Sequence, residues 1–404
     1  MELSSRQEWK VTKLTSLAEK IMVGIASAAT HAYRAKGIPM FRNQNIKSGH
    51  LDDGDLLFIT PEYETVFRNK RLRTGDLVTM RTGYPGVTAI VPPQYDQSQS
   101  FTTLITRPKK DAIDSIFLCH YINSEFGQKF FEHSQIGGAQ KNVNASTLRG
   151  MPIPVPPRQE QLAIGKALSD VDALIAGLEK LIAKKRDLKQ AAMQQLLTGQ
   201  IRLPGFSGEW ARNDLKNLVS TPITDGPHLT PTFYETGVPF LSVNNLANNR
   251  IDWSDLRFIS KADDEIFSRK CKPRKGDVLL GKAASVGKVA IVEDDIDFNI
   301  WSPIALIRAG AQVNAKFLYY QLLSADCISQ VMLLTNASSQ GNIGMGDIEK
   351  IQISYPCYEE QEAIAEVLAD MDAELGSLEA RLAKTRELKQ GMMQELLTGR
   401  TRLV

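Results

Sequence analysis

The sequence has few cysteines and no long hydrophobic run, and these absences exclude several classes of protein. Its 404 residues include four cysteines that lie far apart with no CxxC spacing, so neither a disulfide framework nor a zinc ribbon is indicated. We expect Cys119, Cys271, Cys327 and Cys357 to be buried thiols. No apolar stretch approaches the roughly 20 residues that cross a bilayer, and the start, MELSSRQEWKVTK, has no apolar signal segment. These features predict a cytoplasmic protein without membrane contact.

The sequence also lacks the motifs of common enzymes. The five histidines have no HExxH or other metal spacing, and the nearest string to a methyltransferase motif, Val91-Pro-Pro-Gln94, lacks its amide or acid and its aromatic residue. The stretch Gly281 to Lys288 resembles a phosphate-binding loop, but five residues separate its glycines and Val289 replaces the Ser or Thr that holds magnesium. We therefore predict no catalytic residue, no metal and no cofactor in this chain. An ATPase built on Gly281 to Lys288 is the alternative from the enzyme class.

A strong excess of positive charge is missing as well. The chain has 48 basic and 46 acidic residues, a net charge of +2. The balance is +5 over residues 1–155, +3 over 156–203, −2 over 204–355 and −4 over 356–404. A protein that binds DNA without a partner protein usually carries a marked excess of basic residues, because neutralised phosphates supply most of its affinity for DNA. Either this chain does not bind DNA, or a partner supplies most of the phosphate contacts.

An internal repeat organises the chain. Residues 156–203 align without a gap to residues 356–403, and about half of the positions are identical. The same shift pairs Phe117-Leu118 with Phe317-Leu318, and weaker matches extend toward Trp9 and Trp210. A period this long that occurs only twice indicates a duplicated pair of domains. We predict four segments: 1–155 and 204–355 as two similar domains, and 156–203 and 356–404 as two similar helices.

The two shorter segments have the pattern of long helices. Apolar residues recur in steps of four and three, which is typical of a coiled-coil seam. Prolines precede each pattern, and Gly199 or Gly399 follows it. A helix of roughly 40 residues is about 60 Å long, more than one small domain covers, so the other helix is the expected partner. The predicted seam residues are Ile164, Leu168, Val171, Ile175, Leu178, Ile182, Ile364, Leu368, Met371, Leu375, Leu378 and Leu382.

The two longer segments mix strands with a few helices. Runs such as DLVTM, GVTAIV and TLIT, with their counterparts DVLLG, KVAIVE and IALIR, are rich in β-branched residues and separated by Gly, Pro and Asp. One helix is expected before each long helix, over Ser115 to Phe131 and over Lys316 to Leu334. Each segment is therefore predicted to be an α+β domain.

One basic cluster recurs in both domains, ahead of a Gly-Asp pair. It serves either as an exposed, charged strand edge that discourages aggregation or as a set of phosphate contacts, and its survival in both copies favours phosphate. The members selected as DNA-binding candidates are Lys70, Arg71 and Arg73 in the first copy and Lys272 and Arg274 in the second.

This plan resembles the specificity (S) subunit of type I restriction-modification enzymes. The resemblance rests on the order of domain, helix, domain, helix, and on motifs that occur twice. These are Gly37-Ile-Pro39 with Gly237-Val-Pro239, the Arg-Thr-Gly-Asp and Arg-Lys-Gly-Asp strand starts, the Pro-x-x-Glu-Gln helix entries and the Leu-Leu-Thr-Gly helix exits. It covers essentially the whole chain.

The resemblance implies a fold and a set of partners. Two α+β target recognition domains would be joined by two long antiparallel coiled-coil helices around a pseudo-twofold axis, and each domain would read one half of a bipartite asymmetric site in double-stranded DNA. Two methylation (M) subunits would supply S-adenosylmethionine and the adenine chemistry, and two restriction (R) subunits would supply ATP- and magnesium-dependent cleavage. A system without a restriction subunit fits equally well. The alternative function is a non-catalytic coiled-coil scaffold whose domains bind ligands other than specific DNA.

Candidate base-reading residues lie on the predicted loops. Arg, Lys, Asn and Gln are the side chains that read base edges, and the two copies differ at equivalent positions, as readers of different half-sites should. Each such residue is otherwise a turn residue that satisfies its own backbone. The candidates are Arg42, Asn43, Gln44, Asn45, Arg81, Thr82, Tyr84, Gln140, Lys141 and Asn142 in the first domain, and Ser242, Asn244, Asn245, Lys282, Ser285, Gln340 and Asn342 in the second.

Overall fold

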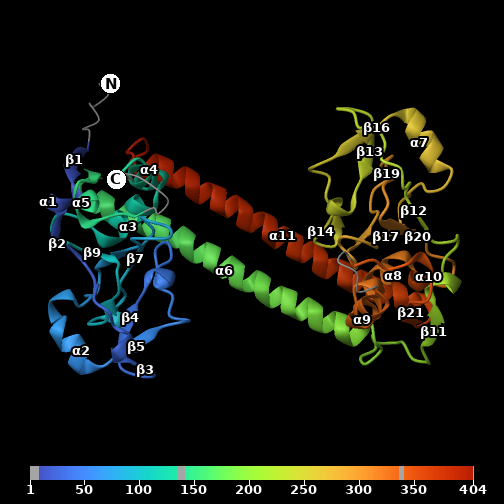
Figure 1. Ribbon diagram of the computed structural model, residues 1–404, viewed down its shortest axis with the longest axis horizontal. Helices are drawn as coiled ribbons and strands as arrows, with labels where there is room; N and C mark the ends of the chain where they lie inside the picture. The colour runs from blue at the N-terminus through green and yellow to red at the C-terminus, as the bar shows by residue number, and fades with distance from the viewer. Residues whose placement is uncertain (1–8, 135–141, 336–340, 404) are drawn as a thin grey trace. The chain divides into compact units, whose positions relative to one another are not determined.

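The computed structural model describes residues 9–134, 142–335 and 341–403, which form two compact units (Figure 1). The first unit joins the chain up to Glu179 with the segment from Ala380 onward, and the second is Lys180–Glu379. The units cut across the four segments predicted from the repeat, because each unit contains one α+β domain together with parts of both long helices. The same layers occur in both units, so the predicted α+β class with an internal repeat is confirmed.

The main layer of the first unit is an antiparallel sheet with strand order β2-β9-β6-β7. Its apolar runs face helices α3 and α4, and Phe117, Leu118 and Phe131 share one core with Leu77 and Leu104. A two-stranded sheet closes the domain next to the long helices. The elements are β1 (Lys10–Lys13), α1 (Leu14–Leu17), β2 (Ala18–Val23), β6 (Leu77–Thr79), β7 (Thr88–Ile90), β9 (Leu104–Pro108), α3 (Ser115–Asn123), α4 (Glu125–His133), α5 (Ala145–Arg149) and β10 (Pro152–Val155).

A second, smaller sheet with strand order β3-β5-β4-β8 forms the other layer of this domain. Its strands contribute Met40 and Ile59, which are buried in a small core of their own. The sheet ends at Thr60, whose hydroxyl oxygen accepts from the backbone N–H of Tyr63 and so starts the next helix. The elements are η1 (Thr30–Ala32), β3 (Tyr33–Arg34), β4 (Ile38–Phe41), η2 (Asn43–Asn45), β5 (Leu57–Ile59), α2 (Pro61–Val66), η3 (Arg68–Lys70), η4 (Pro93–Tyr95) and β8 (Gln99–Ser100).

The second unit repeats this plan. Its main sheet has the order β12-β20-β17-β18, its smaller sheet the order β16-β13-β19, and an additional hairpin pairs β14 with β15. The elements are β11 (Ala211–Asp214), η5 (Leu215–Asn217), β12 (Thr224–Asp225), β13 (Val238–Leu241), η6 (Val243–Asn245), β14 (Leu246–Ala247), β15 (Arg250–Ile251), β16 (Arg257–Ile259), α7 (Lys261–Ser268), β17 (Val278–Gly281), β18 (Val289–Ile291), β19 (Asn299–Ile300), β20 (Ile304–Ile307), α8 (Ala315–Leu322), α9 (Ala325–Leu334), α10 (Met345–Ile348) and β21 (Gln352–Tyr355).

The long helices are α6 (Arg158–Leu196) and α11 (Tyr358–Leu396), and they pack antiparallel. In the first unit, Lys389 of α11 pairs with Asp172 of α6 at 2.5 Å. In the second unit, the equivalent pair joins Lys189 of α6 to Asp372 of α11 at 2.6 Å. Figure 1 shows the two helices in green and red. Sections of the two helices therefore lie side by side in each unit, as the repeat predicted.

The predicted seam has a mixed role. Leu178, Ile182 and Leu375 are buried, as expected of residues between two helices. The first seam residues of each helix instead belong to the domain cores: Ile164 and Leu168 pack with Phe117 and with the end of α11. Ile364 and Leu368 do the same in the second unit. Each helix is thus built into a domain at its start and its end, which fixes the domain on the helix pair.

The helix predicted over Ser115 to Phe131 is two helices, and so is the one predicted over Lys316 to Leu334. Ser124 and Ser324 have extended backbones, and their hydroxyl oxygens accept from the backbone N–H groups of Gly127 and Cys327. A serine that caps a new helix ends the preceding one. The apolar pattern continues through the break, and for this reason the sequence suggested one helix.

Three of the four cysteines are buried, but Cys357 is exposed, so the prediction of a buried thiol was wrong at that position. It lies at the start of α11, where the chain leaves the domain. Among the described residues no single helix is long and apolar enough to span a membrane; α8 and α9 together meet the length and composition but are bent by 63°.

Candidate nucleic-acid interface

Three loops that are far apart in the sequence converge in the first unit. Asn43 follows β4, and its Nδ2 donates to Thr82 Oγ1 at 2.8 Å. Thr82 forms a β-bridge with Asn142, which precedes α5, and Arg81 Nε donates to Asn142 Oδ1 at 3.2 Å. The structure therefore brings four predicted site residues together on one surface. We call this surface, with the adjoining Gln44 and Tyr84, the first loop cluster.

The outer side of the first loop cluster is polar and open. Gln44, Thr82 and Asn142 are exposed, and Tyr84 at the loop tip is 78% exposed. A largely exposed aromatic ring is suited to contact with another macromolecule. Neighbouring Gly83 has a φ of +83°, which a residue with a side chain rarely adopts, so the tight tip depends on glycine.

Arg42 lies at the edge of this cluster and is paired within the domain. Its Nη2 donates to Asp55 Oδ2 at 3.0 Å and to the Asp55 backbone carbonyl at 3.1 Å. Gln44 Nε2 donates to the same carboxylate at 2.5 Å. Because the Asp55 side chain is largely exposed, water screens this pair and its exchange for another partner costs little.

An equivalent surface exists in the second unit, the second loop cluster. Ala283 forms a β-bridge with Asn342, and the backbone N–H of Ile343 donates to Lys282 O at 2.9 Å. The corresponding bond in the first unit joins Val143 N to Arg81 O at 3.0 Å. Asn244 and Asn342 are exposed, whereas Ser242 and Ser285 are half-buried. The same backbone frame thus presents different side chains in the two units.

Asn45 and Asn245 are buried and shape the turns. Asn45 Oδ1 accepts from the backbone N–H of Arg42 at 2.9 Å, and its Nδ2 donates to the carbonyls of Asp52 and Asp55. Asn245 makes the same set of bonds in the second unit. Since these amides are fully used inside the turn, we assign both residues to positioning the loop rather than to contacting DNA. The predicted candidates Gln140, Lys141 and Gln340 lie outside the described residues.

The recurring basic cluster is largely occupied by internal partners. Arg71 forms a two-pronged pair with buried Glu64, with N–O distances of 2.5 and 2.6 Å. Hydrogen bonds from Arg71 hold the pKa of Glu64 below its ordinary value, although burial acts in the opposite direction. Lys272 binds Asp264 at 2.9 Å at the equivalent place in the second unit. These two predicted DNA contacts therefore have a structural partner in the free protein.

The rest of this cluster divides between internal and open positions. Lys70 Nζ donates to the Gly24 carbonyl at 2.8 Å. Arg73 and Arg274 are exposed. These two arginines are the members of the predicted set that have room for a phosphate.

The Gly-Asp pair after the cluster has a structural function that the sequence did not reveal. Buried Asp76 receives Arg107 Nε at 2.9 Å and Nη2 at 2.7 Å, and it caps the backbone N–H of Arg73. Asp277 and Arg308 repeat this arrangement at 2.8 and 2.7 Å. The partners are 31 residues apart in both copies, and only the matching offset of the repeat could have indicated them.

Lys282 is a further candidate with an internal partner. It pairs at 2.5 Å with buried Asp225, which also receives Lys270 at 2.6 Å and contacts His228 at 3.2 Å. Burial alone would raise the pKa of Asp225, but the two lysines hold this pKa below its ordinary value. One carboxylate thus gathers three basic side chains beside the second loop cluster, a grouping that sequence reasoning missed.

The glycine-rich stretch Gly281 to Lys288 connects two antiparallel strands, β17 and β18. A phosphate-binding loop leads from a strand into a helix whose N-terminus faces the phosphate. The stretch is therefore a hairpin turn, and the ATPase alternative loses its structural basis.

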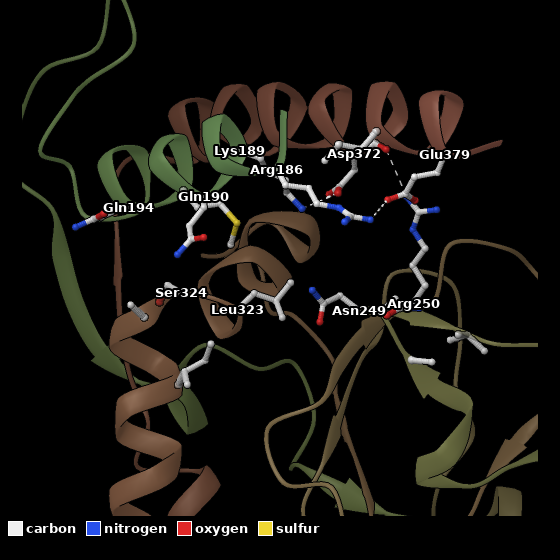
Figure 2. A pocket seen from close by; sticks show the side chains of 18 of the residues that line it. Arg186, Lys189, Gln190, Gln194, Asn249, Arg250, Leu323, Ser324, Asp372 and Glu379 are labelled. Carbon is white, nitrogen blue, oxygen red and sulfur yellow. Dashed lines mark hydrogen bonds and ion pairs between the residues drawn. The ribbon is translucent and has the colours of Figure 1, made fainter. Parts of the chain in front are cut away.

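Repeated residues of the long helices line a cavity in each unit. In the second unit it has a volume of about 1000 Å³ and lies between the helices, α9 and the β14–β15 hairpin. Figure 2 shows Arg186 and Lys189 of α6 meeting Glu379 and Asp372 of α11, each at 2.6 Å. In the first unit the cavity is about 210 Å³. The repeated lining residues are Lys189, Gln190, Met193 and Gln194 in one unit and Lys389, Gln390, Met393 and Gln394 in the other.

Comparison with known proteins gives a consistent result. The family described as type I restriction modification DNA specificity domain matches residues 6–185 and 220–388. The MjaX specificity subunit of Methanocaldococcus jannaschii is 26% identical over 98% of this chain and 94% of its own length. The EcoKI specificity subunit of Escherichia coli is 23% identical over 90% of this chain and 82% of its own. The crystal structure of a type I S subunit from M. genitalium covers 98% of both chains with a TM-score of 0.64 at 15% identity.

Proposed function

We propose, given that this chain belongs to the family of type I restriction-modification DNA specificity proteins, that its two domains each read one half of a bipartite asymmetric DNA site. The chain is the DNA specificity subunit of such a system and is non-catalytic by family. The proposal adds how the work is divided between the two units. The observation that carries it is the repeated loop cluster, which has one backbone frame and two different sets of side chains.

The exposed members of each cluster are the residues we propose to contact bases. In the first domain these are Gln44, Thr82, Tyr84 and Asn142, with Arg42 able to exchange Asp55 for a base. In the second domain they are Asn244 and Asn342, and we add the half-buried Ser285 beside them. Amide side chains read adenine through paired donor and acceptor groups, and arginine reads guanine in the same way. The different sets account for different half-sites.

Asn142 and Asn342 offer a matched pair of variants for the test. The chain is co-expressed with its methylation subunit in a host without adenine methylation, and N6-methyladenine is mapped across the genome. Wild type should give one split motif. Asn142→Ala should relax base preference in one half only and Asn342→Ala in the other half only, by about 5- to 150-fold for the base concerned.

Lys110→Ala, an exposed change away from both clusters, is the control and should leave the motif unchanged. If either asparagine variant altered both halves, the division of labour would be refuted. If wild type methylated DNA without a split motif, the bipartite reading itself would fail.

We also propose that the helices set the distance between the half-sites and hold two methylation subunits. The support is that identical exposed residues, such as Gln190 and Gln390, line equivalent cavities in the two units, as two copies of one partner require. S-adenosylmethionine would be bound by those partners, and ATP and magnesium by two restriction subunits where the system has them. The complex would work in the cytoplasm, where its DNA is. Substituting both glutamines with Arg should reduce the methylation subunits that copurify with the chain, and substituting one should halve them.

A further inference from the structure

We propose that the tip of the β14–β15 hairpin positions the reading turn of the second domain on the helix pair, and so fixes the distance at which the second half-site is read. The tip consists of Asn248, Asn249 and Arg250. This inference rests on the proposed function, because it concerns where the second loop cluster is held rather than which bases it reads.

The reading turn is η6 (Val243–Asn245), and it is continuous with the hairpin and hydrogen-bonded to it. The turn η6 ends at Asn245, and β14 begins at the next residue. Asn245 Nδ2 donates to the carbonyls of Asp252 and Asp255, on the far side of the hairpin, and the backbone N–H of Asp252 donates to Asn245 O at 2.7 Å. A displacement of the tip is therefore transmitted to the turn that carries Asn244.

The tip is bound to the domain's buried helix and to a long helix. The hydroxyl of Tyr319 in α8 donates to Asn249 O at 2.8 Å, and the Tyr319 ring is buried. Arg250 reaches α11, where its Nη2 donates to the Asp372 carbonyl at 3.5 Å. Figure 2 shows Arg250 extending from the hairpin toward α11. Its guanidinium passes 3.7 Å from the place where a Cβ on Gly376 would be, so the glycine leaves room for the approach.

The residue that receives Arg250 is itself a junction. The Asp372 carboxylate binds Lys189 of α6 at 2.6 Å and the Tyr320 hydroxyl of α8 at 2.8 Å. Lys189 also lies over the Tyr320 ring at 5.6 Å. Both long helices, α8 and the hairpin tip therefore meet at Asp372.

The first domain holds its equivalent loop in another way. The tip there is Ser48, Gly49 and His50, and Gly49 joins the domain's own sheet, with its N–H donating to Thr88 O at 2.9 Å. Cys119 takes the place of Tyr319, and its thiol faces Thr88 instead of the tip. Within the residues that the structure describes, no hydrogen bond or ion pair joins this tip to α6 or α11. The duplication thus left one reading turn tied to the helices and the other tied to its own sheet.

This asymmetry leads to a specific expectation. If the tip positions the second turn, weakening it should let the second half-site be read at neighbouring distances without changing the bases preferred in either half. A residue that served only to stabilise the fold would lower methylation at all spacings alike. The ratio of methylation at altered spacings to that at the native spacing separates these two cases.

The test uses the complete complex of this chain with its methylation subunit. A plasmid pool carries both half-sites at the native spacing and at spacings one base pair shorter and longer, and N6-methyladenine is counted at each. Arg250→His installs the residue of the first tip at an exposed position, and Tyr319→Phe removes only the hydroxyl. Each should raise the ratio of altered to native spacing by about fivefold, the factor of one net hydrogen bond.

His50→Ala, in the first tip, is the matched control and should leave the ratio at the wild-type value. A wild-type ratio in both second-domain variants, or a change of preferred bases instead of spacing, would overturn the positioning role. A wild-type complex that yields no split motif would sink the proposed function before any variant is compared, so the two failures are distinguishable.

Discussion

Lowering the pH from 7 to 5 should destabilise the first unit through His120. This histidine lies in α3 against α6, with Nε2 at 3.3 Å from Ser169 Oγ and Nδ1 at 3.9 Å from Asp172. Its pKa is lowered to about 4, chiefly by burial; Asp172 and Asp114 act in the opposite direction, and nearby Lys389 acts in the same direction as burial. The ring is therefore neutral in the folded protein at pH 7 and resists protonation as the pH falls.

The sign and size follow from the two states. The unfolded histidine binds its proton near pH 6.5, and the folded one does so only near pH 4. The unfolded state therefore takes up protons first, so stability is complete above pH 6.5 and is lost progressively down to about pH 4. At about 1.4 kcal/mol per pH unit, the loss at pH 5 is about 2 kcal/mol.

Urea unfolding at pH 7, 6 and 5 of wild type and of His120→Gln measures this loss. Carboxylates also titrate in this range, so at each pH the free energy of unfolding of wild type is subtracted from that of the variant. The change of this difference with pH reports on His120 alone. The variant should gain about 2 kcal/mol on wild type between pH 7 and 5. A difference that stays constant across that range would refute the reasoning, as would an NMR titration showing His120 protonated at pH 6. The second unit, which has Tyr320 at this position, provides an internal comparison.

Two further changes test the internal contacts. Arg107→Ala leaves buried Asp76 without its partner and should lower the free energy of unfolding of the first unit by about 3–5 kcal/mol, which calorimetry should detect as a fall of about 6–20 °C in melting temperature. Lys166→Ala removes an exposed pair with Asp170 and should leave the melting temperature unchanged. An equal effect of the two substitutions would contradict the argument. Leu178→Asp places a charge between the long helices and should abolish methylation of both half-sites together in the mapping assay, whereas loss of one half alone would show that the helices act independently.

The repeat and the apolar periodicity were enough to predict the duplication, the α+β class and the long helices. These features depend on spacing along the chain, which the sequence states directly. The breaks at Ser124 and Ser324 were missed because a serine cap competes locally with a pattern that continues on both sides. Tertiary contacts could not be predicted from spacing along the chain. Lys282 pairs with Asp225, which is 57 residues away, and no local sequence pattern identifies either residue as the other's partner.

The candidate site shows the same division. The sequence predicted the loops that converge, since turn residues and polar side chains identify them, and Asn43, Thr82 and Asn142 do meet. It did not predict which polar residues face outward. Asn45 and Gln44 are neighbours of similar chemistry, yet one is buried in the turn and the other is exposed, because the backbone of a 3-10 turn directs successive side chains differently.

The duplicated chain has kept the buried Asp76–Arg107 ion pair as Asp277–Arg308 and has changed several loop residues, and energetics explain why. Removing the arginine that pairs with a buried carboxylate such as Asp76 or Asp277 lowers the free energy of unfolding by several kcal/mol, so both members of the pair must persist together in each copy. Exposed loop residues such as Gln44 and Asn244 interchange at little cost to stability. The ion pair that persists in both copies is consequently one whose loss would leave a buried charge without a partner. The near-neutral net charge fits the proposal that this chain selects bases while partner subunits supply most of the contacts to the DNA backbone.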